Sequence, residues 1–293
     1  MHLLYCTFGN HFHHHLQAAF SAMSFLQQRN EIDSINIITD TPSFYNHLKG
    51  HVNLIIVSQE KIKEWKGPHD YFFRVKIKAI QHVAELYAGS PVMYCDTDTF
   101  LYSNITELKA DLLKGKPYMH EDEGEISMRP AKNSQRVWQA VKGKTYAGLT
   151  FKATDHMRNA GVIATPNLQN GKDIETVLQI CDAICANSSP LYLCEQFSFS
   201  ATLPHVYNAI GDSTPWIAHY WSNKPDWNQF ILSWVAEQQF KGKTTDEMIA
   251  GIAQLDLGQI PVYIKRRSTA EKLHRRVDKL FPPRNEQYLK RNK

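Results

Sequence analysis

Short apolar runs alternate with helical patterns along the first part of the chain. Apolar runs at 3–6, 35–40 and 52–57 predict strands, and apolar residues at three- and four-residue spacing over 16–26 predict a helix between the first two. Strands that alternate with helices are typical of an α/β fold, with a mostly parallel sheet flanked by helices. Ligands bind beyond the carboxyl ends of the strands in such a sheet. The pattern therefore predicts that the loops after the strands carry the functional residues.

The apolar run at 92–95 ends in two carboxylates, Asp96 and Asp98. If the backbone stays extended there, both side chains point to the same face. Two such oxygen ligands can hold Mg²⁺ or Mn²⁺ and leave coordination sites open for phosphates. An acidic turn after a strand gives the same pattern, so the pair alone leaves both interpretations open. An EF-hand is excluded, because Leu101 stands where its loop requires glycine.

Composition limits the class of protein. The 293 residues are 43% hydrophobic and 11% aromatic, which predicts a folded globular chain. No apolar run reaches the roughly 18 residues of a membrane span, and the N-terminus lacks a signal-peptide pattern. The five cysteines favour free thiols in a reducing compartment, and we therefore expect a cytoplasmic location. The spacing of Cys181, Cys185 and Cys194 permits a zinc site, whereas buried thiols explain it more simply.

Charge is unevenly distributed along the chain. The net charge is +4, yet residues 265–293 hold eleven Lys or Arg and three acids. This contrast predicts a main domain, 1–264, and a basic C-terminal tail, 265–293. Within the tail, residues 268–271 form a capping-box pattern, and the helix they open has an apolar face. That face consists of Leu273, Val277, Leu280 and Phe281.

A basic amphipathic helix is typical of proteins that bind an anionic membrane surface. The tail would then hold the protein peripherally on the inner face of the membrane. A helix packed on the main domain would show the same pattern, so both interpretations stay open. Nucleic-acid binding through the tail is the alternative of another class, and we consider it unlikely because the aromatic stacking motifs of RNA-binding modules are absent.

Other charged side chains are candidates for binding an anion. Arg74 and Lys78 share one face of a helix predicted over 72–87, where they either meet solvent or reach an anionic ligand. His219 is a residue type that suits Mn²⁺, and Lys224 provides a point charge that suits a phosphate oxygen. The histidine cluster at 11–15 opens the first helix, either as its polar start or as a metal site.

Four motifs occur in a fixed order. They are Tyr94-Cys95-Asp96-Thr97-Asp98, Asn159-Ala160-Gly161-Val162, Glu195-Gln196, and His219 with Lys224-Pro225 and Trp227. Together they resemble the retaining glycosyltransferases of the GT-A fold, most closely glycosyltransferase family 8, the group of glycogenin and the lipopolysaccharide galactosyltransferases. The resemblance spans residue 1 to about residue 230. The family's His-x-x-Gly-x-x-Lys-Pro-Trp pattern is one residue shorter here and lacks its glycine, and Phe197 replaces the last acid of its Asp-Gln-Asp motif.

The resemblance implies a GT-A fold, a Rossmann-like nucleotide-diphospho-sugar transferase domain. It implies that Mn²⁺ or Mg²⁺ assists transfer of a sugar from a UDP-sugar, with retention, to a glycan or lipid-linked acceptor. By matching position, the metal ligands are Asp96, Asp98 and His219, and Asp96 also contacts the ribose side of the donor. The remaining roles by position are Lys224 for the departing diphosphate, Asn159 for the sugar, Gln196 beside the anomeric carbon, and Thr7 and Phe8 beside the base. Arg74 and Lys78 are further candidates for donor binding.

Several alternatives remain. An inverting transferase needs a carboxylate base, for which Glu121, Asp122 and Glu123 are candidates. A nucleotidyltransferase also uses paired carboxylates, but the segment 7–10 is too short and not basic enough for its phosphate loop. An inactive binding module is disfavoured by the intact Asp96, Asp98 and Lys224. The sugar, the acceptor and the oligomeric state are not specified by the sequence.

Overall fold

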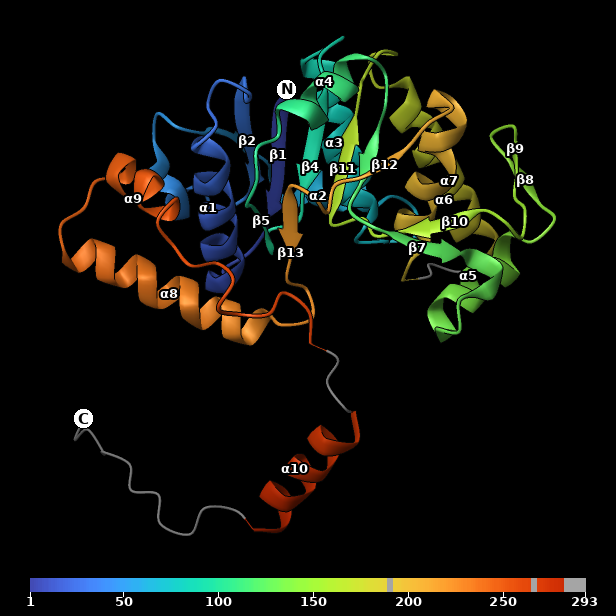
Figure 1. Cartoon of the computed structure of the whole chain (residues 1–293). Coiled ribbons are helices and arrows are strands. Elements are labelled where there is room, and N and C mark those ends of the chain that lie inside the picture. Colours follow the sequence, from blue (N-terminus) through green and yellow to red (C-terminus); the bar gives the residue numbers. More distant parts are fainter. Residues whose placement is uncertain (189–191, 265–267, 282–293) are drawn as a thin grey trace.

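A seven-stranded sheet with helices on both faces forms the centre of the molecule (Figure 1). The computed structural model describes residues 1–188, 192–264 and 268–281. The strand order is β12-β6-β11-β4-β1-β2-β3, and β11 runs antiparallel to both of its neighbours. The strands are β1 (His2–Thr7), β2 (Ser34–Thr39), β3 (Asn53–Ile56), β4 (Val92–Cys95), β6 (Tyr118–Met119), β11 (Val162–Thr165) and β12 (Gly211–Asp212). The other pairings are parallel, which confirms the predicted mostly parallel sheet flanked by helices.

Side chains on the two faces of the sheet join two separate cores. Along β1, Leu3 and Tyr5 face one core and Leu4 faces the other, because successive side chains of a strand alternate. The first core packs on α1 (Phe12–Leu26), α4 (Thr106–Leu113), α8 (Lys224–Phe240) and α9 (Thr245–Ile252). The second packs on α2 (Gln59–Lys66), α3 (Arg74–Leu86), α5 (Lys132–Val141), α6 (Lys172–Ser188) and α7 (Cys194–Tyr207).

Three small antiparallel ribbons lie outside the main sheet. They are β5 (Thr99–Leu101) with β13 (Ile217–His219), β7 (Asp122–Glu125) with β10 (His156–Arg158), and β8 (Thr145–Tyr146) with β9 (Leu149–Thr150). Short 3₁₀ helices follow β2 (η1, Pro42–Leu48) and β7 (η2, Ile126–Met128). In the first ribbon His219 pairs with Thr99, which brings the histidine to the end of β4.

The backbone between β4 and β5 differs from the prediction. Residues 96–98 form a turn, in which the Thr99 amide donates to the Asp96 carbonyl at 3.2 Å, so an extended backbone there is wrong. The strands predicted at 3–6, 35–40 and 52–57 match β1, β2 and β3 and are confirmed.

The predicted tail helix is α10 (Ser268–Leu280). Leu273, Val277 and Leu280 on this helix and Phe281 directly after it are all exposed. The other parts of the predicted tail, 265–267 and 282–293, lie outside the described residues. Within the described ranges, no helix has both the length and the hydrophobicity needed to cross a bilayer.

Candidate functional site

Three side chains with metal-ligating atoms meet at the carboxyl end of β4. One ligand atom each from Asp96, Asp98 and His219 lies within 4.8 Å of the other two. Two carboxylates and an imidazole are a donor set that suits Mn²⁺, and the turn at 96–98 brings the carboxylates together without an extended backbone. The group could therefore hold a divalent cation.

Asp98 is the most buried of the three, with only 3% of its surface exposed. Its Oδ2 lies 2.9 Å from Lys224 Nζ and 3.3 Å from His219 Nε2. Burial alone would raise the pKa of Asp98, but His219 and Lys224 outweigh it and hold the pKa below its ordinary value. The carboxylate is thus ionised at neutral pH and attracts cations.

The imidazole of His219 is fixed from two sides. Asn159 Oδ1 lies 3.2 Å from His219 Nδ1 and accepts from the Gly161 amide at 2.9 Å. Because the Asn159 amide oxygen can only accept, Nδ1 donates to it, and Nε2 faces Asp98, where a bound metal ion would take the place of a proton. The ring also packs on Gly161, where an added Cβ would lie 2.2 Å from His219 Cε1. Only glycine at position 161 leaves room for the histidine.

A cleft of 790 Å³ surrounds this group. It lies beyond the ends of β1, β2 and β4, where ligands of parallel sheets bind. Three lysines line it, Lys66 from α2, Lys76 from α3 and Lys224 from α8. Of the residues singled out in the sequence, the cleft brings together Thr7, Phe8, Asp96, Asp98, Asn159, Gln196, His219 and Lys224.

Arg74 and Lys78 do not line the cleft. Of the two alternatives predicted for them, contact with the donor is therefore not supported. Arg74 donates to both carboxylate oxygens of Asp182 on α6, at 2.7 and 2.9 Å. Lys78 donates to Gln81, one turn further along α3. The two side chains share a helix face, as predicted, but that face is turned away from the cleft.

Lys76 reaches the cleft from the opposite side of the same helix, and the sequence reasoning missed it. Its Nζ lies 3.2 Å from Asp96 Oδ1 and 3.2 Å from Glu195 Oε1. Burial opposes its charge, but these two carboxylates raise the pKa of Lys76 above its ordinary value. One signal was present: position 76 falls on the apolar stripe of α3 with Ile80 and Val83, where a lysine is unusual.

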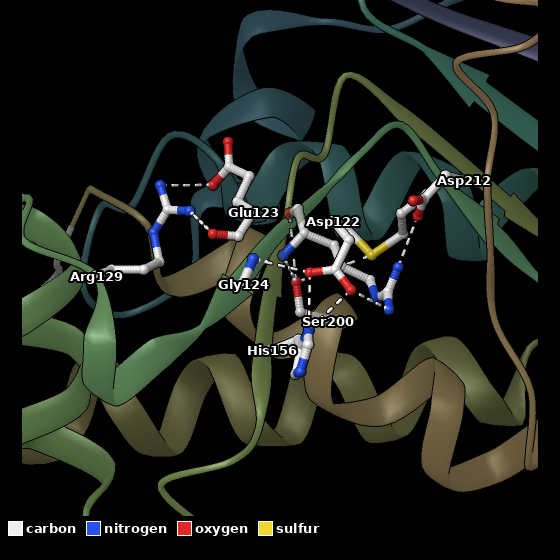
Figure 2. A network of polar contacts seen from close by, with 9 residues as sticks. Asp122, Glu123, Gly124, Arg129, His156, Ser200 and Asp212 are labelled. Carbon is white, nitrogen blue, oxygen red and sulfur yellow. Dashed lines mark hydrogen bonds and ion pairs between the residues drawn. The ribbon is translucent and has the colours of Figure 1, made fainter.

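The three candidate bases, Glu121, Asp122 and Glu123, differ in their surroundings, and a polar network beside the cleft holds Asp122 (Figure 2). Asp122 accepts from His156 and Arg158 on β10, and Arg158 also donates to Asp212. Burial opposes ionisation of Asp122, but the Gly124 amide and these two partners hold its pKa below the ordinary value. Asp122 therefore ties the β7–β10 ribbon together and does not line the cleft.

Glu123, the next residue, points the other way and does line the cleft. Arg129 lies 2.9 Å from its Oε2, and Gln196 donates to the same oxygen at 3.0 Å. Glu121 lines a second cavity, described below. Of the three acids, only Glu123 borders both spaces.

The cysteines are free thiols. Cys181, Cys185 and Cys194 are buried in the core between α6 and α7. Among the described residues, only Asp96, Asp98 and His219 form a group of three potential ligands close enough to hold one ion. The histidine cluster at 11–15 forms no such group within the described residues, and its His15 is buried and contacts Tyr45 and the Gly9 carbonyl.

Solved structures of sugar transferases are similar to this chain. One is the galactosyltransferase LgtC in complex with donor and acceptor sugar analogs, with 13% identity, coverage of 72% of both chains and a TM-score of 0.46. Another is an active-site mutant of LgtC, with 14% identity, coverage of 72% of this chain and 71% of that chain, and a TM-score of 0.46. The apo form of mouse xyloside xylosyltransferase 1 has 12% identity, coverage of 72% and 84%, and a TM-score of 0.41.

Comparison by sequence adds no relative. No protein-family model matches the chain, and a search of curated proteins gives no match. The similar structures are glycosyltransferases, the class that the motifs resemble.

Proposed function

We propose that the protein is a metal-dependent glycosyltransferase. It moves a sugar from a nucleotide-sugar, a UDP-sugar, to a glycan or lipid-linked acceptor with retention of configuration. The observation that carries the proposal is the group Asp96, Asp98 and His219, set beside Lys224 in a lysine-lined cleft at the strand ends. Anionic diphosphates and a divalent cation are the ligands that such a combination attracts.

The reaction makes one bond and breaks another. A bond forms between the acceptor oxygen and the anomeric carbon while the bond from that carbon to the diphosphate oxygen breaks, and the acceptor proton leaves with the diphosphate. Asp96, Asp98 and His219 would hold Mn²⁺ or Mg²⁺, which supplies Lewis-acid stabilisation of the leaving group. Lys224 adds a second positive charge on the same side of the cleft.

The rest of the cleft fits the other parts of a donor. Phe8 packs edge-to-face on Phe72 and offers an aromatic surface for the base, next to Thr7. On the sugar side, the Gln196 amide is oriented by Glu123, and Asn159 is anchored at His219. Lys76 and Glu195 add a buried charged pair there, which can bind sugar hydroxyls.

The test is a screen of nucleotide-sugars for metal-dependent hydrolysis and transfer. We expect UDP-sugars to be turned over in Mn²⁺ and not in EDTA. Turnover that persists unchanged in EDTA contradicts the proposed mechanism. NMR of the product reports the anomer separately, and an inverted product would assign Glu123 as the base, since it is the candidate that borders the cleft.

A membrane surface is a second proposed partner, through the tail. Leu273, Val277 and Leu280 of α10 and Phe281 just after it are exposed, and the tail is strongly basic. A basic helix with an apolar face binds anionic lipid by burying that face at the headgroup boundary. Leu273→Glu together with Leu280→Glu should abolish co-sedimentation with anionic vesicles and leave UDP-sugar hydrolysis intact. Unchanged vesicle binding by this variant would contradict the proposal.

A further inference from the structure

A second cavity, of 1110 Å³, opens beside the cleft. It shares Glu123, His219 and Trp221 with the cleft, so the two spaces meet at the metal-ligating group. From there it follows the β5–β13 ribbon to the end of α1, where Gln27 and Gln28 line it. We call this space the groove.

One wall of the groove is the segment 253–263, which follows α9. The Pro261 carbonyl accepts from Asn223 Nδ2 at 2.9 Å and from Trp227 Nε1 at 3.2 Å. Just beyond the segment, the Ile264 amide donates to Ser222 Oγ at 2.9 Å. These contacts hold the wall to the start of α8, where Lys224 lies, and to the two residues just before it, so the groove is a fixed part of the fold.

The charge of the groove is opposite to that of the cleft. Among the described residues that line it there is no lysine or arginine, and its formal charges are those of Glu121 and Glu123. The cleft, in contrast, has three lysines. Because Glu123 is already paired with Arg129, an acidic ligand that enters the groove would meet the charge of Glu121 and no lysine or arginine in the lining. The lining therefore favours an uncharged ligand.

Aromatic side chains supply the contact surface. Tyr102, Trp221 and Tyr263 line the groove and are 51%, 49% and 56% exposed. Trp221 and Tyr263 lie edge to face with ring centroids 5.8 Å apart, and Tyr102 is anchored by its hydroxyl on the Thr214 carbonyl. Exposed rings grouped on one concave surface mark a binding site for a ligand with apolar faces.

Polar groups are also present at the floor. His120 is 6% exposed and packs on the His219 ring, and its Nδ1 has no hydrogen-bond partner within the described part of the chain. Together with the amide of Gln27, it gives the groove uncharged polar groups, whereas the amide of Gln28 is held by the Ser103 carbonyl and the Ile105 amide. Rings for apolar faces and neutral polar groups for hydroxyls are the two features by which a sugar is bound.

We propose that the groove binds the acceptor, and that the acceptor is an uncharged oligosaccharide. Its reacting hydroxyl lies where Glu123, His219 and Trp221 border both spaces. The groove volume exceeds the roughly 300–1,000 Å³ of ordinary small-molecule sites, so it takes more than one sugar ring. This inference rests on the proposed transferase function.

The test uses the full chain and an array of neutral hexose tetrasaccharides, each paired with the same glycan carrying a terminal carboxylate or phosphate. Binding is measured with and without Mn²⁺ and UDP. We expect neutral glycans to bind at least about tenfold more tightly than their acidic partners, because the acids enter without a cation to pair with. Equal or tighter binding of the acidic glycans overturns the proposal, as does binding of no glycan by a protein that binds Mn²⁺ and UDP.

Variants locate the binding to the groove. Tyr102→Ala and Tyr263→Ala should each weaken neutral glycan binding about fivefold or more, because each removes an aromatic contact surface. Phe240→Ala is the matched control, since Phe240 is an exposed aromatic residue that lines neither space. Glycan affinities equal to wild type in both tyrosine variants would place the acceptor elsewhere.

The affinity for Mn²⁺ and UDP distinguishes a failure of the proposed transferase function from a failure of the acceptor assignment to the groove. If the nucleotide does not bind, the proposed function fails. The glycan measurement without nucleotide still tests whether the groove binds a neutral oligosaccharide. If the nucleotide binds and the tyrosine variants behave as wild type, only the groove assignment fails.

Discussion

The cleft and the groove are neighbours with opposite character. The cleft is lined by lysines from three helices, whereas the groove has two glutamates and three exposed aromatic rings. Both end at His219, so one imidazole borders a space lined by lysines and a space whose charged lining residues are acidic. Under the proposed function, this difference would separate the anionic donor from an uncharged acceptor by charge.

The two spaces also differ in how the chain builds them. The cleft is formed at the ends of parallel strands, where alternation of strands and helices brings distant loops together. The groove depends on the β5–β13 ribbon and on the segment 253–263, which has no regular secondary structure of its own. Each of the following changes alters one side of this comparison.

The largest loss of stability is expected for a substitution on α3, where Lys76 lines the cleft and Arg74 does not. Lys76→Gln leaves Asp96 and Glu195 without their shared cation and should cost about 3–5 kcal/mol of unfolding free energy. Arg74→Gln removes a partly exposed pair with Asp182 and should cost about 1 kcal/mol. Urea unfolding of both variants measures the difference. Equal losses would show that Lys76 is not the buried partner of the two acids.

Asp98→Asn tests the metal-ligating group itself. It keeps the shape of the side chain but removes the buried charge, and we expect a hundred- to thousandfold lower turnover, or about 2.7–4 kcal/mol of barrier. Mn²⁺ binding followed by calorimetry should weaken in parallel. Asp226→Asn, an exposed acid close to Lys224 in sequence, is the control and should behave as wild type. Full activity of Asp98→Asn would show that turnover does not require the metal-ligating group of the cleft.

His120 tests the neutral side of the comparison through pH. Burial, with a smaller contribution from His219, lowers the pKa of His120 from 6.5 to about 3. Below pH 6.5 the unfolded chain takes up a proton that the folded chain does not, so stability falls as the pH is lowered from 6.5 toward 3. By pH 5 this loss is about 2 kcal/mol. His120→Gln, unfolded in EDTA, should lose that much less than wild type between pH 8 and pH 5. Parallel curves would show that His120 titrates normally.

The smallest effect concerns Lys224, whose side chain is 43% exposed. Lys224→Gln should weaken UDP binding in Mn²⁺ about tenfold, since one charged contact to the diphosphate is lost. Raising the salt concentration should shrink the gap between wild type and variant, because exposed charges are screened. Lys241→Gln, beyond the other end of α8 and paired with Glu237, is the matched control. An equal loss in both variants would indicate a nonspecific effect of net charge.

Much of the fold could be predicted because it follows from short-range patterns. The alternation of strands and helices gave the mostly parallel sheet, and β1 to β3 lie where the apolar runs place them. The approach of Asp96, Asp98 and His219 could be anticipated only from the resemblance, since the histidine arrives through the pairing of β13 with β5. The reason first given for the carboxylate pair was wrong, because a turn and not an extended strand brings the two together.

The failures have physical causes too. The shared face of Arg74 and Lys78 allows either solvent or an anionic ligand as their contact, because spacing along a helix does not say which face meets the cleft. Lys76 was overlooked although it lies on the apolar stripe of α3. The groove could not be predicted at all, because it joins Tyr102, Trp221 and Tyr263 from segments with no shared pattern.

The packing of Gly161 on His219 links two distant positions of the chain. A larger residue at 161 would occupy the volume of the imidazole and push it off Asp98, and a smaller residue at 219 would leave a hole under the loop. Neither position can be altered alone without loss, so the two behave as one unit of sequence. Other chains that carry this site should therefore be recognised by the glycine and the histidine as a pair, even where every residue between them has changed.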